Sequence, residues 1–101
     1  MYARLLHIRW KPTTDLETVT NIYRESILPA AREQKGFVAA TLIHSEDDPE
    51  ASLSISIWES KEDALTGEAS GYLQEQVNKV TAYLAAPPER KGGNVGVHSS
   101  D

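Results

Sequence analysis

Residues 51–58 alternate between hydrophobic and polar positions more regularly than any other segment of the chain. This two-residue period predicts a β-strand with two distinct faces. Residues 2–10 and 37–44 alternate less strictly but are rich in branched and aromatic side chains, so we expect strands there too. A short, glycine-weakened fourth strand is predicted at residues 94–98. The two faces of the 51–58 strand carry Leu53, Ile55 and Ile57 on one side, and Ser52, Ser54, Ser56 and Trp58 on the other.

After the first predicted strand, hydrophobic residues recur at the spacing of an α-helix. Thr14 and Glu17 have the spacing of a capping box, which predicts a helix beginning there. Pro29 removes one N–H and should bend the last turns, and Gly36 supplies a left-handed end before the next strand. The expected buried stripe consists of Leu16, Val19, Tyr23, Ser26, Ile27 and Ala30.

A second helix is predicted after the regular strand. Ser60 is a good N-cap with acidic residues in the turn that follows, and Pro87 ends the helical segment. Gly67 and Gly71 weaken its first half, so a break near them is expected. The expected buried stripe consists of Leu65, Ala69, Tyr72, Leu73, Gln76, Val80 and Leu84.

The order of these elements predicts an α+β fold. Strand, helix, strand, strand, helix, strand is the order of the ferredoxin-like βαββαβ fold, a four-stranded antiparallel sheet with two helices on one face. We expect one domain over residues 1–98 and a polar tail at 99–101. Because both faces of the predicted sheet are half apolar, a second copy of the chain is expected to cover the face without helices. This face would form a homodimer interface.

Composition narrows the function classes. The chain has 101 residues, no cysteine and a formal net charge of -5 with no basic cluster. Thiolate chemistry is therefore excluded, and nucleic acid is not expected as a partner. The three histidines lie far apart, and the acidic run at 46–50 lacks the glycine of a calcium loop, so no metal site is predicted. The sequence contains no phosphate loop or dinucleotide fingerprint, and no other cofactor is predicted. No segment is apolar enough to suggest a membrane partner, and a cytoplasmic location is expected.

Several motifs together resemble one known family. They are the run from Ile27 to Phe37, the junction from Ile57 to Ser60 with Asp63 and Ala64 after it, and the proline-terminated second helix. Over about residues 2–98 the chain is similar to the antibiotic biosynthesis monooxygenase family of dimeric α+β barrels. The resemblance implies a cavity between sheet and helices, which some members use to oxygenate polycyclic aromatic substrates with molecular oxygen and without metal or flavin.

The resemblance also suggests residue roles. A tryptophan at the position of Trp58 lines the cavity in the oxygenating members, and a strand histidine there corresponds to His44. Ser54 and Ala64 stand where an amide and a phenol are expected, so the proton relay of those enzymes is not carried over. In the haem-degrading branch His7 would stand for an asparagine, but no histidine near Glu68 serves as the iron ligand, which disfavours haem degradation.

Two functions stay open at this point. In the first, the protein is a cofactor-independent monooxygenase for a small aromatic or quinol-type substrate, in which a histidine acts as base and the Trp58 ring orients the substrate. In the second, it is a non-catalytic ligand-binding or structural dimer, in which Trp58 only fills the core. The candidate catalytic residues are His44, His7 and Trp58, and the candidate substrate-binding residues are Trp58, Tyr23, Tyr72 and Ser54.

Overall fold

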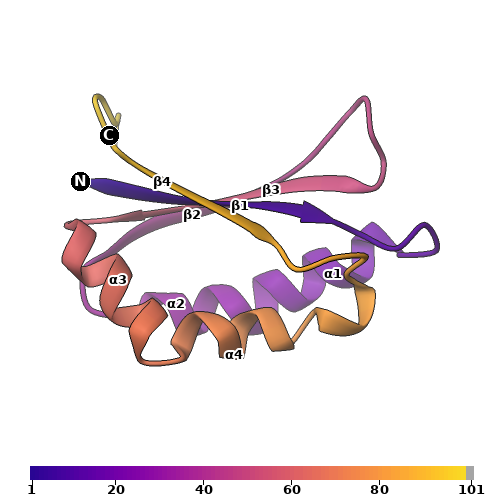
Figure 1. Ribbon diagram of the computed structural model, residues 1–101, viewed down its shortest axis with the longest axis horizontal. Coiled ribbons are helices and arrows are strands. Elements are labelled where there is room, and N and C mark those ends of the chain that lie inside the picture. Colours follow the sequence, from indigo (N-terminus) through magenta and orange to yellow (C-terminus); the bar gives the residue numbers. More distant parts are fainter. Residues whose placement is uncertain (100–101) are drawn as a thin grey trace.

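A four-stranded antiparallel sheet with helices on one side forms the molecule, as the sequence predicts (Figure 1). The computed structural model describes residues 1–99. The strand order is β2-β3-β1-β4, which is that of the ferredoxin-like fold. The strands are β1 (Tyr2–Arg9), β2 (Phe37–His44), β3 (Ala51–Trp58) and β4 (Glu89–Asn94).

The helix layer consists of two broken helices and a short 3₁₀ turn. Figure 1 shows them packed beneath the sheet, while the upper face of the sheet has no helix over it. Among residues 1–99, no helix has the length and apolar character needed to cross a bilayer. The elements are α1 (Leu16–Ile22), the π-helical segment η1 (Tyr23–Ile27), α2 (Leu28–Arg32), α3 (Lys61–Ala69), α4 (Tyr72–Asn78) and η2 (Thr81–Tyr83).

The N-cap of the first helix lies one residue later than expected. Asp15, and not Thr14, is the N-cap, and its carboxylate accepts hydrogen bonds from the Glu17 N–H at 3.1 Å and from the Thr18 hydroxyl at 3.2 Å. The predicted capping box is therefore wrong, because a carboxylate stands next to the threonine and reaches the free N–H groups of the first turn. The Thr14 hydroxyl donates instead to the Tyr83 carbonyl.

Pro29 changes the hydrogen bonding of the helix just before it. The Leu28 N–H donates to the Tyr23 carbonyl, five residues back, so η1 is a wide π turn. A proline ring would clash with the carbonyl four residues earlier in a regular helix, and the wider turn relieves that clash. Gly36 then adopts a φ of +81°, the left-handed conformation that was predicted.

The second helix breaks at Gly71, whose φ is +88°. The break reorients the chain, so α3 and α4 do not share one continuous stripe. Leu65 and Ala69, which the stripe predicted as buried, are exposed, whereas Ala64 and Gly67 are buried in their place. Ser60 caps α3 as expected, with its hydroxyl accepting from the Asp63 N–H at 3.1 Å.

The fourth strand lies earlier than predicted. It occupies Glu89–Asn94 and pairs with β1, whereas residues 94–98 were expected. All its side chains are polar or absent and all are exposed, so it shows no hydrophobic alternation from which a strand could be predicted. Of the predicted polar tail, Ser99 is exposed, and residues 100–101 lie outside the described part of the chain.

The two faces of the sheet carry different side chains. Arg4, Leu6 and Ile8 of β1 face the helices together with the serines of β3. The opposite parity, with Leu5 and the three large residues Leu53, Ile55 and Ile57, lies on the face without helices. A bulge in β2 between Phe37 and Ala39 interrupts the alternation and puts Phe37 on the same side as Ala40 and Leu42.

Candidate ligand cavity

Between the sheet and the helices lies a cavity of about 80 Å³. Residues of both core clusters line it, Trp58 from the cluster with Tyr2 and Ala64, and all three members of the cluster of Trp10, Val19 and Val80. Most of its lining is aliphatic, and it contains Trp58, Tyr23, Tyr72 and Ser54, the four residues predicted to bind substrate. Their presence in one cavity places them together, while their role in binding stays a prediction.

Two serines of β3, Ser54 and Ser56, line one side of the cavity, and Ser52 lies on the same face of the strand. The Ser52 hydroxyl accepts from the Trp10 indole N–H at 2.8 Å, and the Ser56 hydroxyl accepts from the Trp58 indole N–H at 3.0 Å. Ser54, between them, is in hydrogen-bonding contact with the Tyr23 hydroxyl. Because the serines are small, and Ser52 and Ser56 each accept from an indole N–H, the strand leaves space beneath the helices without burying an unpaired polar group.

Trp58 lines the cavity and is almost completely buried. It is 1% exposed, and its ring meets the ring of Phe37 edge-on at a centroid distance of 5.7 Å. The guanidinium carbon of Arg4 lies 5.2 Å from the centroid of the Trp58 ring, a cation–π distance. With its N–H held by Ser56, Trp58 offers a bound molecule only its ring surface.

Tyr23 and Tyr72 supply phenol groups to the cavity. Burial raises the pKa of Tyr23, and the hydrogen bond with Ser54 offsets part of that rise. Burial also raises the pKa of Tyr72, against the opposing effect of the positive charge on Arg4. Both hydroxyls therefore stay protonated at neutral pH and can donate a hydrogen bond to a ligand.

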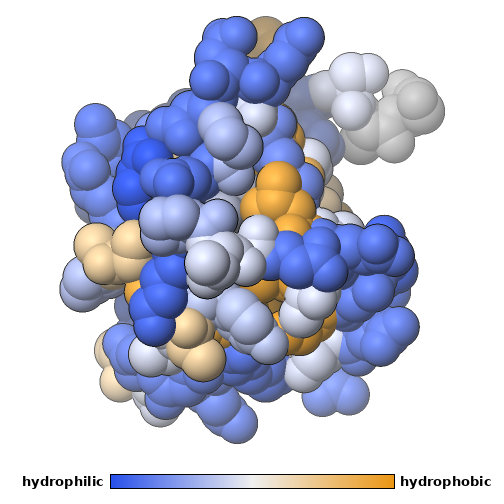
Figure 2. All heavy atoms as spheres, turned by 90° about the vertical axis from the view of Figure 1, so that its right-hand side faces the viewer, coloured by the Kyte–Doolittle hydropathy of each residue, from blue (hydrophilic) through white to orange (hydrophobic). Residues whose placement is uncertain are grey.

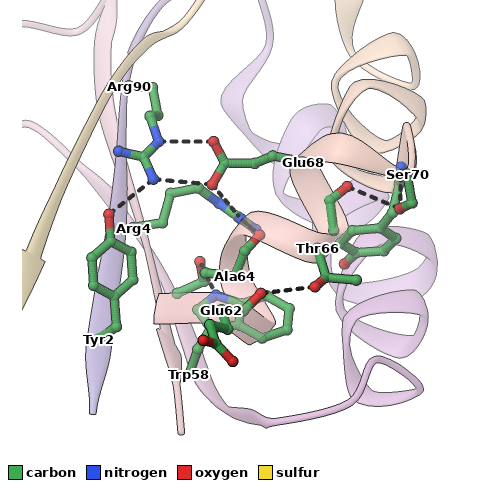
Figure 3. Close-up of polar contacts among 12 residues, drawn as sticks. Tyr2, Arg4, Trp58, Glu62, Ala64, Thr66, Glu68, Ser70 and Arg90 are labelled. Atoms are coloured by element: carbon green, nitrogen blue, oxygen red, sulfur yellow. Dashed lines mark hydrogen bonds and ion pairs between the residues drawn. The ribbon is translucent and has the colours of Figure 1, made fainter. Parts of the chain in front are cut away.

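Arg4 is a cavity residue that the sequence patterns did not single out. It is 3% exposed, and its Nη1 donates to the Ala64 carbonyl at 3.1 Å and to the Glu68 carboxylate at 3.2 Å. Figure 3 shows Glu68 between Arg4 and Arg90, with Arg90 also reaching the Tyr2 hydroxyl. The available signal was its parity, since Arg4 lies two residues from Tyr2 and from Leu6 on the inward side of β1.

Glu68 is held in its charged form by these two guanidinium groups. Burial alone raises the pKa of Glu68, but the hydrogen bonds from Arg90 and Arg4 outweigh it, and the net pKa is below the ordinary value. Two cations thus share one carboxylate. The cluster keeps one net positive charge beside the cavity.

His44 lies outside the cavity in a directed hydrogen-bond chain. Its Nε2 is 2.8 Å from the Thr20 hydroxyl, whose own hydrogen is donated to the Leu16 carbonyl at 2.6 Å, so we assign the Nε2–H tautomer. The Nδ1 atom then accepts from the Ser52 hydroxyl at 2.7 Å. Both ring nitrogens are occupied, and His44 ties α1 to the sheet.

His7 lies on the opposite face of the sheet from the cavity. It is exposed on β1, across from Leu53 of β3 and Glu89 of β4. The structure therefore separates the three predicted catalytic residues, since only Trp58 lines the cavity. Among residues 1–99, no group of three or more His, Asp or Glu side chains lies close enough together to hold a metal ion.

A groove between α4 and the segment leading into β4 lies next to the cavity. It has a volume of about 570 Å³ and shares Leu6, Leu73, Val77, Leu84 and Pro88 with the cavity. Figure 2 shows hydrophobic atoms between hydrophilic side chains at the end of the molecule where α1 begins, so the apolar interior also reaches the surface there.

No family model matches the sequence, and no curated protein matches it. Solved structures are similar in fold. A protein from Nitrosomonas europaea, provisionally described as an antibiotic biosynthesis monooxygenase, superposes with a TM-score of 0.76 at 18% identity, covering 96% of this chain and 100% of the other.

Two similar structures come from Streptomyces species. SnoaB of Streptomyces nogalater, described as a cofactor-independent oxygenase, has a TM-score of 0.74 at 14% identity and covers 99% of this chain and 97% of its own. The monooxygenase ActVA-Orf6 of Streptomyces coelicolor, solved with the ligand nanaomycin D, has a TM-score of 0.73 at 15% identity, with coverages of 98% and 92%. The chain thus has the fold of the antibiotic biosynthesis monooxygenases, as its sequence motifs predict.

Proposed function

We propose that the protein is a cofactor-independent monooxygenase that oxidises a small aromatic or quinol-type substrate. The observation that carries the proposal is the cavity that brings the Trp58 ring together with the Tyr23, Tyr72 and Ser54 hydroxyls. The protein has the fold of SnoaB and ActVA-Orf6, which are described as an oxygenase and a monooxygenase. The shared fold makes this chemistry a reasonable hypothesis, and the cavity offers an apolar space with a few polar groups in which a substrate can bind.

The reaction needs no redox group from the protein. An electron-rich phenol that is oxidised to a quinone gives up four electrons, which reduce one molecule of oxygen completely. One oxygen atom becomes the new carbonyl and the other leaves as water, with the two hydrogens lost from the substrate. The protein then has to hold the ring, exclude water and stabilise the charge that develops on the substrate.

Each cavity residue has a role in this proposal. The Trp58 ring provides a flat apolar wall for the substrate, and the Tyr23 and Tyr72 phenols orient its oxygen atoms. Ser54 holds the Tyr23 hydroxyl in place. His44 does not touch the substrate in this proposal. It is a positioning residue, and its hydrogen bond with Ser52 holds β3 in place.

The proposal includes a homodimer through the open face of the sheet. Leu53, Ile55 and Ile57 of β3 lie there, and Ile43 of β2 is 46% exposed. Water contact with these aliphatic side chains costs free energy, which a second copy laid across the face would recover. His7 lies on the same face and would be part of this interface.

Oxygen uptake tests the enzyme hypothesis. The purified protein is mixed with hydroquinones and anthrone-like substrates in an oxygen electrode, and the products are analysed after reaction in ¹⁸O₂. Turnover should place one labelled oxygen atom in the product, which is a hydroxyquinone from a hydroquinone and a quinone from an anthrone. Trp58→Phe and Tyr72→Phe should lower the turnover, while Leu65→Ala, on the exposed side of α3, should not. Uptake no faster than in buffer across the whole panel contradicts the proposal.

A second candidate is a ligand-binding dimer without catalysis. It is favoured by one observation, which is that no histidine is found among the residues lining the cavity in the described part of the chain. Such a protein would bind the same aromatic molecules without consuming oxygen. Saturable binding without turnover would decide for this candidate.

A further inference from the structure

We propose that the cavity takes a one-ring aromatic molecule that carries an anionic oxygen, a phenolate or a carboxylate, with Arg4 as its counter-ion. The inference deepens the proposed function and rests on it only for the use of this cavity. It commits to the charge and the size of the ligand, which the shared fold does not specify.

The first argument is the unused side of the Arg4 guanidinium. Both of its hydrogen bonds use Nη1, and among residues 1–99 no partner is found for Nε or Nη2. In the same part of the chain, no sealed-off side-chain nitrogen or oxygen lacks a partner. Since Arg4 lines the cavity and is only 3% exposed, we infer that these two N–H groups are accessible from the cavity. Together they form a fork that matches two oxygens of a carboxylate or one phenolate oxygen.

The second argument is the sign of the charge around the cavity. Glu68 neutralises only one of the two guanidinium groups that bind it, Arg4 and Arg90. No Asp or Glu is among the described residues that line the cavity. A buried cation with an incomplete counter-charge attracts an anion strongly, because little water screens it.

The third argument is the excess of hydrogen-bond donors. The Tyr23 and Tyr72 phenols stay protonated, as argued above, and can donate to an anionic oxygen. Gln76 also lines the cavity and is buried, and Lys79 Nζ holds its Oε1 at 2.7 Å, which leaves the amide N–H₂ as the free end. These donors converge in a lining that offers few free acceptors.

The absence of a nearby base fits the same ligand. His44 has both ring nitrogens occupied, and His7 lies on the other face of the sheet. A molecule that enters already ionised needs no base in the cavity. Arg4 then performs the remaining task, which is to stabilise the anion away from water.

Volume sets the limit on size. The cavity of about 80 Å³ is smaller than the ~150 Å³ of an engineered apolar cavity that binds benzene. One ring can be admitted if Leu73 and Val77 move towards the adjoining groove, which both residues also line. Two or three fused rings would require the helices to move away from the sheet.

Binding of matched pairs of anion and neutral molecule tests the proposal. Titration calorimetry of the wild-type protein compares benzoate with benzamide, and 4-nitrophenolate with nitrobenzene, at the same pH and ionic strength. Each anion should bind at least about tenfold more tightly than its neutral partner. The carboxylate and phenolate arms show which of the two oxygens the cavity prefers, and 2-naphthoate should bind more weakly than benzoate.

Variants assign the preference to Arg4. Arg4→Gln should abolish the preference for the anion, Arg4→Lys should keep part of it, and Arg90→Gln, whose side chain does not line the cavity, should keep most of it. If Arg4→Gln does not fold, the affinity of the wild type for 4-nitrophenol against pH gives the answer. It should rise as the ligand itself ionises.

Two results would overturn the inference. One is equal affinity for anion and neutral partner in the wild type, and the other is a preference that persists in folded Arg4→Gln. Preferential binding of anions without oxygen uptake would support this inference and contradict the proposed monooxygenase activity. Turnover of neutral aromatic substrates without any preference for anions would support the monooxygenase activity and contradict this inference.

Discussion

The two faces of the sheet are built from alternate residues of the same strands, yet they meet different surroundings. On β3 the serine face lies under the helices and borders the cavity, while the face with Leu53, Ile55 and Ile57 has no helix over it. Hydrophobicity alone would assign them the other way round. The comparison teaches that a small polar residue can belong to the interior when it pairs with an aromatic donor, as Ser56 does with Trp58.

The largest effect is expected when a charged side chain is introduced on the face of the sheet without helices. Ile55→Asp places a carboxylate at the centre of the proposed dimer interface, and the cost of burying it should raise the dimer dissociation constant by about 10³-fold or more. Sedimentation velocity measures this. Leu65→Asp, at an exposed position on α3, is the matched control and should leave the dimer intact. A wild-type protein that sediments as a monomer at micromolar concentration would remove the interface from the account.

Substituting the two histidines, one on each face of the sheet, compares the stability that each face contributes. His44→Ala removes the ring that joins Thr20 to Ser52 on the covered side, and the loss of both partly buried hydrogen bonds should cost about 1–3 kcal/mol of unfolding free energy. His7→Ala, at an exposed position, should change it by less than about 0.5 kcal/mol in the monomer. Urea denaturation provides both values, and equal losses would show that the two side chains do not differ in this way.

Filling the cavity from the serine side should weaken ligand binding. Ser54→Val adds volume to the wall and removes the partner of Tyr23, so we expect the affinity for benzoate to fall about tenfold. Thr41→Val makes a similar change on the opposite face and should not affect this affinity. Calorimetric titration of both variants checks it, and unaltered binding in Ser54→Val would place the ligand elsewhere.

The smallest effect concerns pH and the charge cluster on the covered side. The pKa of Glu68 is lower in the folded protein than its unfolded value of about 4.3, so its stabilising contribution is present above that value and is lost as pH falls through the folded pKa. The destabilisation by Glu68→Gln should therefore be largest at neutral pH and shrink in acid, by at most ~1 kcal/mol because the pair with Arg90 is partly exposed.

Thermal melts at several pH values measure this dependence. Glu46→Gln, in the exposed turn, is the control and should show no such trend. A Glu68→Gln penalty that does not change with pH would mean that the carboxylate acts through packing.

Local signals were sufficient for most of the fold. The alternation of residues 51–58, the Ser60 cap and the left-handed Gly36 each depend on neighbours in the sequence, and all three predictions are confirmed. The cap of the first helix and the first part of the buried stripe of the second, Leu65 and Ala69, were wrong where one residue decides the outcome. Asp15 competes with Thr14 for the cap, and Gly71 rotates α4 relative to α3.

The cavity was less predictable because it depends on contacts across the chain. Tyr23, Tyr72, Ser54 and Trp58 were placed together through their parity and the family resemblance. Arg4 was missed because its parity alone does not show that a charged side chain is buried there. Its hydrogen bonds with Ala64 and Glu68, 60 and 64 residues along the chain, do show it. β4 was misplaced for a similar reason, since its strand character comes from pairing with β1 and not from its side chains.

Methyl NMR can compare the two faces in one titration. With Leu, Ile and Val methyl groups labelled and benzoate added, the account predicts shifts at Leu6, Leu42 and Leu73, which line the cavity, and none at Leu53, Ile55 or Ile57. Shifts confined to Leu53, Ile55 and Ile57 would contradict the claim that the serine side of the sheet holds the ligand.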